Sequence, residues 1–416
     1  MSNESSVAGE DWFANPALGR IFAVFNQDGE EIRVVGGAVR NALMGLPVSD
    51  VDLATTWAPE QVVARAEAEG IRAVPTGIDH GTVTLVIDGQ GFEITTLRHD
   101  AETDGRRAKV NFGQDWQVDA ERRDFTINAL YANQKGEIID LIGGLEDIES
   151  RTVRFIGAAD ARVAEDYLRV LRYFRFYAGY GSGRPDAAAL KACTRARDRL
   201  SSLSAERIWK ELKLLFAARD PGRALLWMRQ TGVLTAVLPE TEKWGIDSVA
   251  GLIATETALD WDVDPMLRLM AIVPPDGERM KALAAQLKMS RAEAERLSAW
   301  AAAPVVKPTA AITVLDRLLY RHGVEPLCDR IRLSIVSART RVETDTAAMT
   351  EAAGFTRHLA HASGWTRPVF PVSGADLIAM GVEPGPEMGA RLNALEDRWV
   401  DSNFALSKDA LLDSAG

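Results

Sequence analysis

The sequence predicts a head of mixed α and β structure followed by a long all-helical remainder. At 416 residues the chain exceeds the usual size of a single domain, so two to four domains are expected. The first 150 residues alternate between strand-like and helix-like patterns. After Gly143 and Gly144 the strand signals fade, and alanine, leucine, arginine and glutamate dominate the remaining sequence.

The head begins with four short elements. Their patterns predict a strand, a helix, a strand and a helix, in this order, at residues 31–37, 38–45, 48–56 and 58–70. A β-hairpin is expected at residues 81–98, because two alternating runs flank Asp88-Gly89, which is a strong turn signal. Residues 99–120 are polar, charged and weakly periodic, so we expect a long mobile loop there.

Proline and glycine divide the helical remainder. Residues 204–234 predict two helices that separate at Asp220-Pro221. Further helices are bounded by prolines at positions 304, 308 and 326. Residues 373–399 predict a helix, a Gly/Pro turn and a second helix.

Composition indicates a globular, cytoplasmic protein. Hydrophobic residues make up 47% of the chain and charged residues 26%, which suits a sizeable core. The N-terminus lacks a signal-peptide pattern, and no apolar stretch approaches the ~20 residues of a membrane span, so we expect no membrane partner. Cys193 and Cys328 match no disulfide or zinc spacing, which favours a reducing compartment.

The distribution of charge leaves room for a polyanionic partner. The net charge of −11 argues against a protein coated in positive charge. Residues 151–199, however, carry eleven Lys or Arg against five Asp or Glu, a local net charge of +6. A focused basic stripe can guide a polyanion into one cleft of an acidic protein.

The glycine pair after the first expected strand, Gly36-Gly37, fits neither common phosphate-binding motif. A dinucleotide-binding turn would need G-x-G-x-x-G and an acidic residue about 20 positions later. A Walker loop would need G-x-x-x-x-G-K-[ST], and the sequence contains no such string. An oxidoreductase function therefore has only the glycines in its favour.

Asp50 and Asp52 suggest a different chemistry. If both lie in one strand, their side chains share a face, and two carboxylates held so close are usually relieved by a divalent cation such as Mg²⁺. Gly36 and Gly37 would let backbone N–H groups approach a triphosphate, and Arg40 would add a fork of donors. Taken alone, the aspartate pair is more often an exposed strand end, and the glycine pair is more often a plain turn. Together they favour a nucleotidyltransferase.

Two neighbouring segments add candidates. Glu93, on the second strand of the expected hairpin, is equally compatible with a third carboxylate and with an exposed strand residue. Arg122, Arg123 and Asp124 precede an apolar segment, where they form either a salt-bridged helix start or a phosphate clamp. Their proximity to the other candidates favours the clamp.

Residues 165–176 predict a helix with basic residues along one side. Asp166, Arg169, Arg172 and Arg175 recur every three positions, which is typical of an exposed basic face. A second interpretation follows from hydrogen bonding. An Asp acceptor beside an Arg donor complements the pairing edges of cytosine and adenine, whereas uracil and guanine present the reverse pattern. Asp166 with Arg169 could thus select C and A without a nucleic-acid template.

Several motifs occur in the order and spacing of one known family. They are GGAVR…DVD, EITTLR, RRDFTINAL, DLIGGLEDI, EDYLRVLRYFRF and SAERIWKEL. From residue 34 to about residue 212 the chain resembles the class II tRNA nucleotidyltransferase/poly(A) polymerase family, and within it the bacterial CCA-adding enzymes. Residues 370–392 also look like the C-terminal helical region of such enzymes.

The resemblance implies an α+β fold: a polymerase-β-like nucleotidyltransferase head with a mixed sheet, followed by an all-α neck, body and tail. The implied domains are a catalytic head, a neck with the nucleotide-selecting helix, a body and a tRNA-binding tail, at residues 1–140, 141–218, 219–305 and 306–416. Residues 140–147 would form the hinge region between head and neck.

The resemblance also implies roles for individual residues. The catalytic carboxylates would be Asp50 and Asp52, which hold Mg²⁺, and Glu93. The nucleotide would be bound by Gly36, Gly37, Arg40, Arg123, Asp124, Asp166, Arg169, Arg172 and Arg175. A flexible loop would contribute Asp104, Arg106 and Arg107. The family commonly has Asp where Asn41 stands, so a role for this position in orienting the arginine is in doubt.

The implied reaction is attack of a tRNA 3′-hydroxyl on the α-phosphate of CTP or ATP, with release of pyrophosphate and a rebuilt CCA end. The partners would be tRNA, CTP and ATP, and no DNA is expected. A retained loop at residues 99–120 favours addition of A as well as C. The alternatives are a poly(A) polymerase, a CC- or A-adding enzyme, and a catalytically silent RNA- or nucleotide-binding protein.

Overall fold

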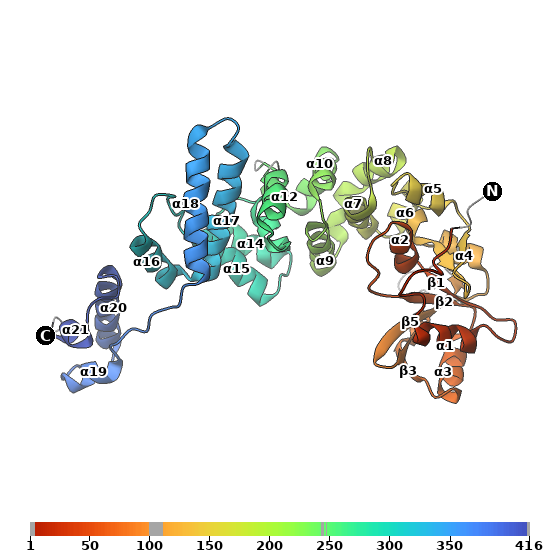
Figure 1. The fold of residues 1–416 in the computed structure, drawn as a ribbon, viewed down its shortest axis with the longest axis horizontal. Coiled ribbons are helices and arrows are strands. Elements are labelled where there is room, and N and C mark those ends of the chain that lie inside the picture. The colour runs from red at the N-terminus through yellow and green to blue at the C-terminus, as the bar shows by residue number, and fades with distance from the viewer. Residues whose placement is uncertain (1–4, 100–110, 243–244, 247, 414–416) are drawn as a thin grey trace. The chain divides into compact units, whose positions relative to one another are not determined.

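The computed structural model describes residues 5–99, 111–242, 245–246 and 248–413 (Figure 1). The chain forms two compact units, which are described separately. Unit 1 contains residues 1–202 and 231–233, and unit 2 contains residues 203–230 and 234–416. The predicted domain boundaries at residues 140, 218 and 305 remain predictions.

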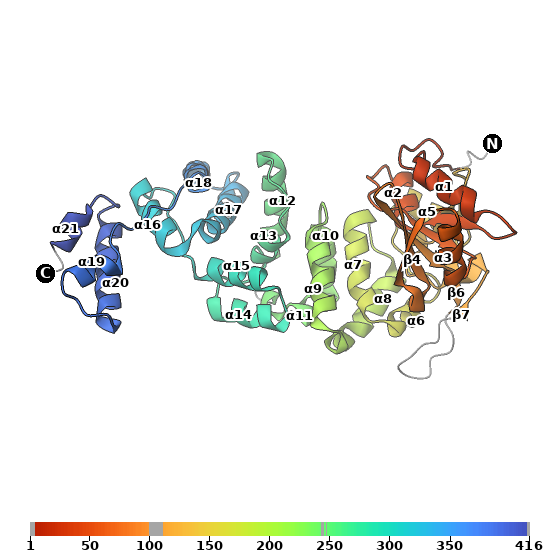
Figure 2. The same ribbon diagram turned by 90° about the horizontal axis from the view of Figure 1, so that it is seen from below.

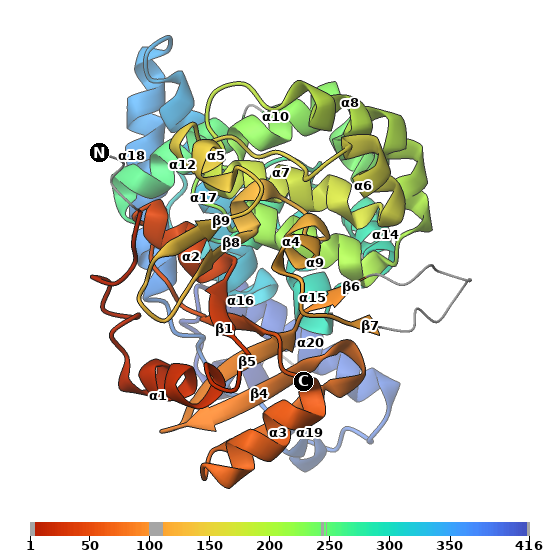
Figure 3. The same ribbon diagram turned by 90° about the vertical axis from the view of Figure 1, so that its right-hand side faces the viewer.

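A mixed seven-stranded sheet forms the centre of unit 1, as predicted (Figure 3). Its strand order is β3-β4-β5-β2-β1-β8-β9, and β2 and β5 run parallel, whereas the other neighbours are antiparallel. The strands are β1 Ile32–Val35, β2 Asp52–Thr55, β3 Arg72–Gly77, β4 Thr82–Ile87, β5 Gln90–Thr96, β8 Leu130–Ala132 and β9 Ile138–Asp140.

The predicted hairpin is confirmed as β4–β5. Asp88 and Gly89 connect the two strands with φ angles of 51° and 80°, the left-handed pair that a two-residue type I′ turn requires. Buried and half-buried residues alternate along β4, because one face packs into the core. Strand β3, which the sequence patterns did not predict, pairs with the outer side of β4.

Helices cover the sheet and continue beyond it. They are α1 Pro16–Phe25, α2 Gly37–Leu43, α3 Pro59–Ala68, α4 Trp116–Glu121, α5 Gly144–Glu149, α6 Ala159–Glu165, α7 Leu168–Tyr180 and α8 Ala187–Ala196. Figure 3 shows α3 beside β4, which it contacts. An aromatic cluster then fixes α7 to the chain that follows α4. The ring centroids of Phe125 and Phe176 lie 4.8 Å apart, and those of Phe155 and Tyr173 lie 5.4 Å apart.

The prediction of a loop over residues 99–120 is wrong in its second half, where the chain forms a short strand and a helix. Asp115 caps helix α4 by accepting hydrogen bonds from the backbone N–H groups of Gln117 and Val118. Strands β6 Arg98–His99 and β7 Asn111–Phe112 pair with each other. The predicted loop residues, Asp104, Arg106 and Arg107, lie outside the described residues.

The described part of unit 2 is helical, as predicted. Its helices are α9 Ala205–Phe216, α10 Gly222–Gln230, α12 Ser248–Leu259, α13 Pro265–Met270, α14 Gly277–Gln286, α15 Arg291–Ala302, α16 Ile312–His322, α17 Val324–Arg341, α18 Thr346–Ser363, α19 Gly374–Ala379, α20 Pro386–Asp401 and α21 Lys408–Leu412, and α11 Val233–Val237 begins in unit 1. Figure 2 shows the contacting helices α14 and α15 side by side. The breaks predicted at Asp220-Pro221 and in the 373–399 segment are confirmed.

Candidate active site

The three predicted catalytic carboxylates lie near the start of strand β2. Asp52 is its first residue, and its Cα is the register partner of the Cα of Glu93 on the parallel strand β5. Asp50 lies two residues before the strand, so the prediction that both aspartates share one strand is wrong for Asp50. All three residues are exposed. The predicted catalytic carboxylates therefore lie near one another, where the inner strand β2 begins beside β5.

The electrostatics of these carboxylates fit a divalent cation. Although Asp52 reaches solvent, neighbouring protein removes part of its hydration, and this is the largest cause that raises its pKa. Repulsion from Glu93 and then from Asp50 raises the pKa further, whereas Arg123 lowers it. Such a like-charged oxygen donor set suits Mg²⁺.

The carboxylates alone do not make a closed metal cage. Among the described residues, no three Asp, Glu, His or Cys side chains converge closely enough to hold an ion. Mg²⁺ usually takes one or two carboxylates and completes its shell with water and phosphate oxygens. An open site is therefore what a metal shared with a nucleotide would require.

The glycine turn lies between β1 and α2. Gly36 has φ 75° and ψ −116°, a conformation that residues with a Cβ rarely adopt. Its N–H donates to the carbonyl of Leu130 at 3.1 Å, so the prediction that this N–H points at a phosphate is wrong. Gly37 is the first residue of α2, where an α-helix leaves the N–H without an intrahelical acceptor.

Replacing Gly36 by alanine should lower activity because it strains this turn. A positive φ at a residue with a Cβ costs about 1–3 kcal/mol, and here the strain falls beside Arg123, whose Nη1 would lie 3.7 Å from the new Cβ. We expect at least about a tenfold loss of nucleotide addition, measured as kcat/KM for CTP. Gly29, which also has a positive φ but has open space around it, provides the matched control. Equal losses in both variants would contradict a role for the turn.

Arg40 is not the free phosphate-binding fork that the sequence suggested. Its side chain is buried, and burial lowers its pKa. It donates to the side chain of Asn128 and, at 2.7 Å, to the hydroxyl of Tyr180, whose ring lies 3.8 Å from the guanidinium carbon. It also donates to Asn41. The prediction of direct triphosphate contact is therefore wrong for this structure, because protein partners occupy the guanidinium.

Asn128 joins Arg40 to helix α7, the predicted base-selecting helix, a connection that the sequence analysis missed. Its side-chain oxygen accepts from Arg40, and its amide group donates to Asp124 at 3.1 Å. Asp124 accepts from Arg172 of α7, with 2.9 Å between Nε and Oδ2. The signal available in the sequence was a lone asparagine within the apolar run that follows Asp124.

Arg123 is held by Asp119, a residue in the segment that was predicted to be a loop. Asp119 of α4 is fully buried and pairs with Arg122 and with Arg123, the latter at 3.0 Å. It also accepts from the Tyr131 hydroxyl at 2.7 Å. Burial alone would raise the pKa of Asp119, but Arg123 and Arg122 outweigh it and hold the pKa below its usual range. Arg123 is thus fixed near the carboxylates by a buried anion.

The predicted base-selecting helix is interrupted at Asp166. This residue is extended, with φ −153°, and lies between α6 and α7 rather than within a helix. Its carboxylate accepts from the backbone N–H of Leu168 at 3.0 Å. Arg169 pairs with Glu165 and donates to the carbonyl of Arg162 at 2.8 Å. The continuous-helix prediction is wrong at its start, because Asp166 caps α7 locally.

Two other predicted regions have defined places. The guanidinium of Arg175 lies 4.4 Å from the ring centroid of Phe176.

In the predicted hinge, the Asp140 carboxylate accepts hydrogen bonds from the backbone N–H groups of residues 142, 143, 144 and 145. Asp147 is buried and bonds to Thr126 and Arg154. The hinge segment is thus anchored at both ends, while its bending remains a prediction.

Comparison with known proteins bears on this site. The family model described as "Poly A polymerase head domain" matches residues 32–154, and one described as "Probable RNA and SrmB- binding site of polymerase A" matches residues 184–244. CCA tRNA nucleotidyltransferase 1, mitochondrial, of Danio rerio is 33% identical over 97% of this chain and 91% of its own length. The chain belongs to the tRNA nucleotidyltransferase/poly(A) polymerase family.

Two further relatives support the assignment, and another solved structure shows the same fold. The CCA-adding enzyme of Leuconostoc mesenteroides is 30% identical over 92% of this chain and 91% of its own length. The structure of the Bacillus stearothermophilus CCA-adding enzyme in complex with CTP superposes with a TM-score of 0.67 and 27% identity, covering 92% of each chain. The Thermotoga maritima enzyme complexed with tRNA_CCA, at 18% identity and a TM-score of 0.60, covers 96% of this chain and 94% of its own, and shares the fold.

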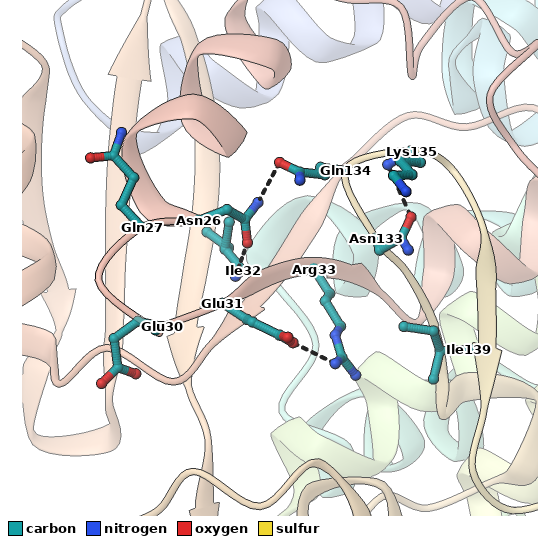
Figure 4. A pocket seen from close by; sticks show the side chains of 11 residues that line it. Asn26, Gln27, Glu30, Glu31, Ile32, Arg33, Asn133, Gln134, Lys135 and Ile139 are labelled. Carbon is teal, nitrogen blue, oxygen red and sulfur yellow. Dashed lines mark hydrogen bonds and ion pairs between the residues drawn. The ribbon is translucent and has the colours of Figure 1, made fainter.

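The polar hollow drawn in Figure 4 is separate from the family's motifs. It has a volume of about 380 Å³ and opens beside the start of β1, at Ile32 and Arg33, not at the glycine turn beyond the end of that strand. None of the predicted catalytic or nucleotide-binding residues lines it. Along the described chain, no helix is both long and apolar enough for a membrane span.

Proposed function

We propose that this chain adds C, C and A to the 3′ end of tRNA from CTP and ATP, without a template and with release of pyrophosphate. The observation that carries the proposal is the register of Asp52 with Glu93, beside Asp50, in a chain of this family. Similarity to CCA tRNA nucleotidyltransferases along nearly the whole length favours CCA addition over poly(A) addition.

Asp50 and Asp52 would hold Mg²⁺, and Glu93 would keep the site strongly anionic. When bound, Mg²⁺ promotes ionisation of the attacking 3′-hydroxyl and neutralises charge on the leaving pyrophosphate. Arg123, oriented by Asp119, faces the same carboxylates and would bind phosphate oxygens of the nucleotide. Gly37 would contribute its backbone N–H, and Arg40 would support the turn from the protein side.

The base would be read by Asp166 and Arg169 at the start of α7. An acceptor beside a donor matches the amino group and ring nitrogen of cytosine and adenine. Arg169 would have to exchange its contact with Glu165 for the base, while Asp166 keeps its cap. Arg172, paired with Asp124, would hold α7 in place against the nucleotide-binding part of the head.

Replacing Arg169 by alanine should reduce base selection more than catalysis. Because a site that loses its hydrogen-bonding partner rejects the wrong base poorly, we expect the preference for CTP over UTP to fall by about a hundredfold or more. The measurement is kcat/KM for single-nucleotide addition with each triphosphate. Arg195→Ala, which removes an exposed arginine paired with Asp160, is the control. An unchanged CTP/UTP ratio would remove Arg169 from base reading.

Turnover separates this function from that of a silent RNA- or nucleotide-binding protein. Purified protein with tRNA lacking its last three nucleotides, CTP, ATP and Mg²⁺ should release pyrophosphate only when protein, tRNA, nucleotides and metal are all present. A binding protein would retain tRNA and CTP without pyrophosphate release. The length of the RNA product distinguishes the remaining alternatives: three added nucleotides for CCA addition, two or one for partial enzymes, and a long tract for a poly(A) polymerase.

We also propose a cytoplasmic location. Both Cys193 and Cys328 are free thiols in the structure, as expected in a reducing compartment. Three similar vertebrate proteins are named as mitochondrial. Fractionation of the cells that produce the protein, followed by detection of the chain in each fraction, would test the location.

A further inference from the structure

The side chain of Asn41 uses both ends of its amide. Its oxygen accepts two hydrogen bonds from Arg40, at 3.1 Å from Nε and 2.8 Å from Nη2. Its nitrogen donates to the backbone carbonyl of Pro47 at 2.8 Å. Asn41 lies on α2, directly after the glycine turn, and Pro47 lies three residues before Asp50.

The chemistry of the partners fixes the orientation of this amide. Arginine can only donate hydrogen bonds, and a backbone carbonyl can only accept them. The oxygen must therefore face Arg40, and the nitrogen must face Pro47. A carboxylate at this position, which is common in the family, would satisfy Arg40 but would place an acceptor against the acceptor of Pro47.

These bonds connect the base-selecting helix with the chain that leads to the carboxylates. On one side, Arg40 reaches Tyr180 of α7 directly and Arg172 through Asn128 and Asp124. On the other side, the segment of residues 44–51 is bonded to α2 through Pro47 and through the N–H of Leu46, which donates to the Asn41 carbonyl at 2.8 Å.

We propose that Asn41 is a positioning residue. Its side chain fixes segment 44–51, which contains Asp50, relative to Arg40 and the hydrogen-bond partners of Arg40. Its side chain bonds to Arg40 and to the Pro47 carbonyl, and it would act through them. Its oxygen orients Arg40, and its nitrogen fixes the turn at Pro47, so one side chain positions both halves of the GGAVR…DVD motif. The part of this proposal that concerns catalysis rests on the proposed nucleotidyltransferase function.

Two substitutions separate the two bonds. Asn41→Asp keeps the acceptor for Arg40 and removes only the donor to Pro47, whereas Asn41→Ala removes both. Hydrogen–deuterium exchange of the metal-free protein should become about tenfold faster in segment 44–51 in Asn41→Asp. In Asn41→Ala the faster exchange should extend to α2. Since Asp50 is then less well placed, kcat for CTP addition should fall about three- to tenfold in Asn41→Asp, with little change in KM for tRNA.

Asn133→Asp provides the matched control. Asn133 also donates to one group, Glu137, and accepts from another, the N–H of Lys135, but it lies in the turn between β8 and β9. Its substitution should leave both the exchange of segment 44–51 and kcat unchanged. Exchange and kcat at the wild-type level in Asn41→Ala would overturn the proposal, as would a fall in kcat that is equal in Asn41→Asp and Asn133→Asp. If the wild-type protein adds no nucleotide, the function fails instead, and the exchange data still decide the structural role.

Discussion

Replacing Asp52 by alanine is expected to lower nucleotide addition at least about a thousandfold, because several kcal/mol of metal-dependent transition-state stabilisation are lost. The fold should remain, since Asp52 is exposed at the first position of β2 and its removal relieves repulsion from Glu93 and Asp50. The measurement is single-turnover extension of tRNA with CTP at saturating Mg²⁺, alongside thermal unfolding.

Two further variants test whether the loss comes from the missing carboxylate of Asp52. Asp52→Asn keeps the size of the side chain and should be nearly as inactive as Asp52→Ala, because a neutral amide is a poor ligand for Mg²⁺. Asp11→Ala, an exposed aspartate in the turn before α1, should behave like wild type. Asp52→Ala with more than about a tenth of wild-type activity would exclude this residue from the metal site.

Replacing Asp119 by alanine should produce the largest loss of stability among the site residues. Asp119 is fully buried and neutralises Arg122 and Arg123, so its removal leaves partly buried cations without their anion and the buried Tyr131 hydroxyl without its acceptor. Breaking a buried pair from one side costs about 3–5 kcal/mol. We expect this decrease in the free energy of unfolding, measured by urea denaturation, together with a raised KM for CTP because Arg123 is no longer fixed.

The contribution of Asp119 to the free energy of unfolding should depend on pH. Since the folded-state pKa of Asp119 lies below the unfolded value of about 3.9, its stabilisation is present above that value and is lost as the pH falls through the folded pKa. The difference in unfolding free energy between wild type and Asp119→Asn should therefore shrink below about pH 4. A difference that stays constant from pH 7 to pH 3 would contradict the buried ion pair.

The local features of the chain could be predicted because they depend on neighbouring residues. Asp88-Gly89 predicts its hairpin turn since both positions need a positive φ, which these residue types tolerate best. The glycine turn and the break at Asp220-Pro221 follow from similar backbone constraints. The mixed sheet, in contrast, entered the prediction only through the family resemblance.

The remaining features depend on contacts between distant residues. The register of Asp52 with Glu93 joins parallel strands that are 41 residues apart, and no local pattern specifies such pairing. The burial of Arg40 depends on Tyr180, which belongs to another helix. Asp119 lies in a polar segment whose composition indicated a loop, and only the partners Arg122, Arg123 and Tyr131 show that it belongs to the core.

In the proposed function, protein side chains choose C twice and A once without a nucleic-acid template. The most direct measurement is single-nucleotide incorporation by the purified protein into three tRNAs that lack CCA, CA or A, with each of the four triphosphates in turn. We expect incorporation of CTP into the first two tRNAs, of ATP into the third, and no addition to a complete CCA end. Incorporation of UTP at a rate comparable to CTP, or repeated addition of A to the first tRNA, would contradict the proposed function.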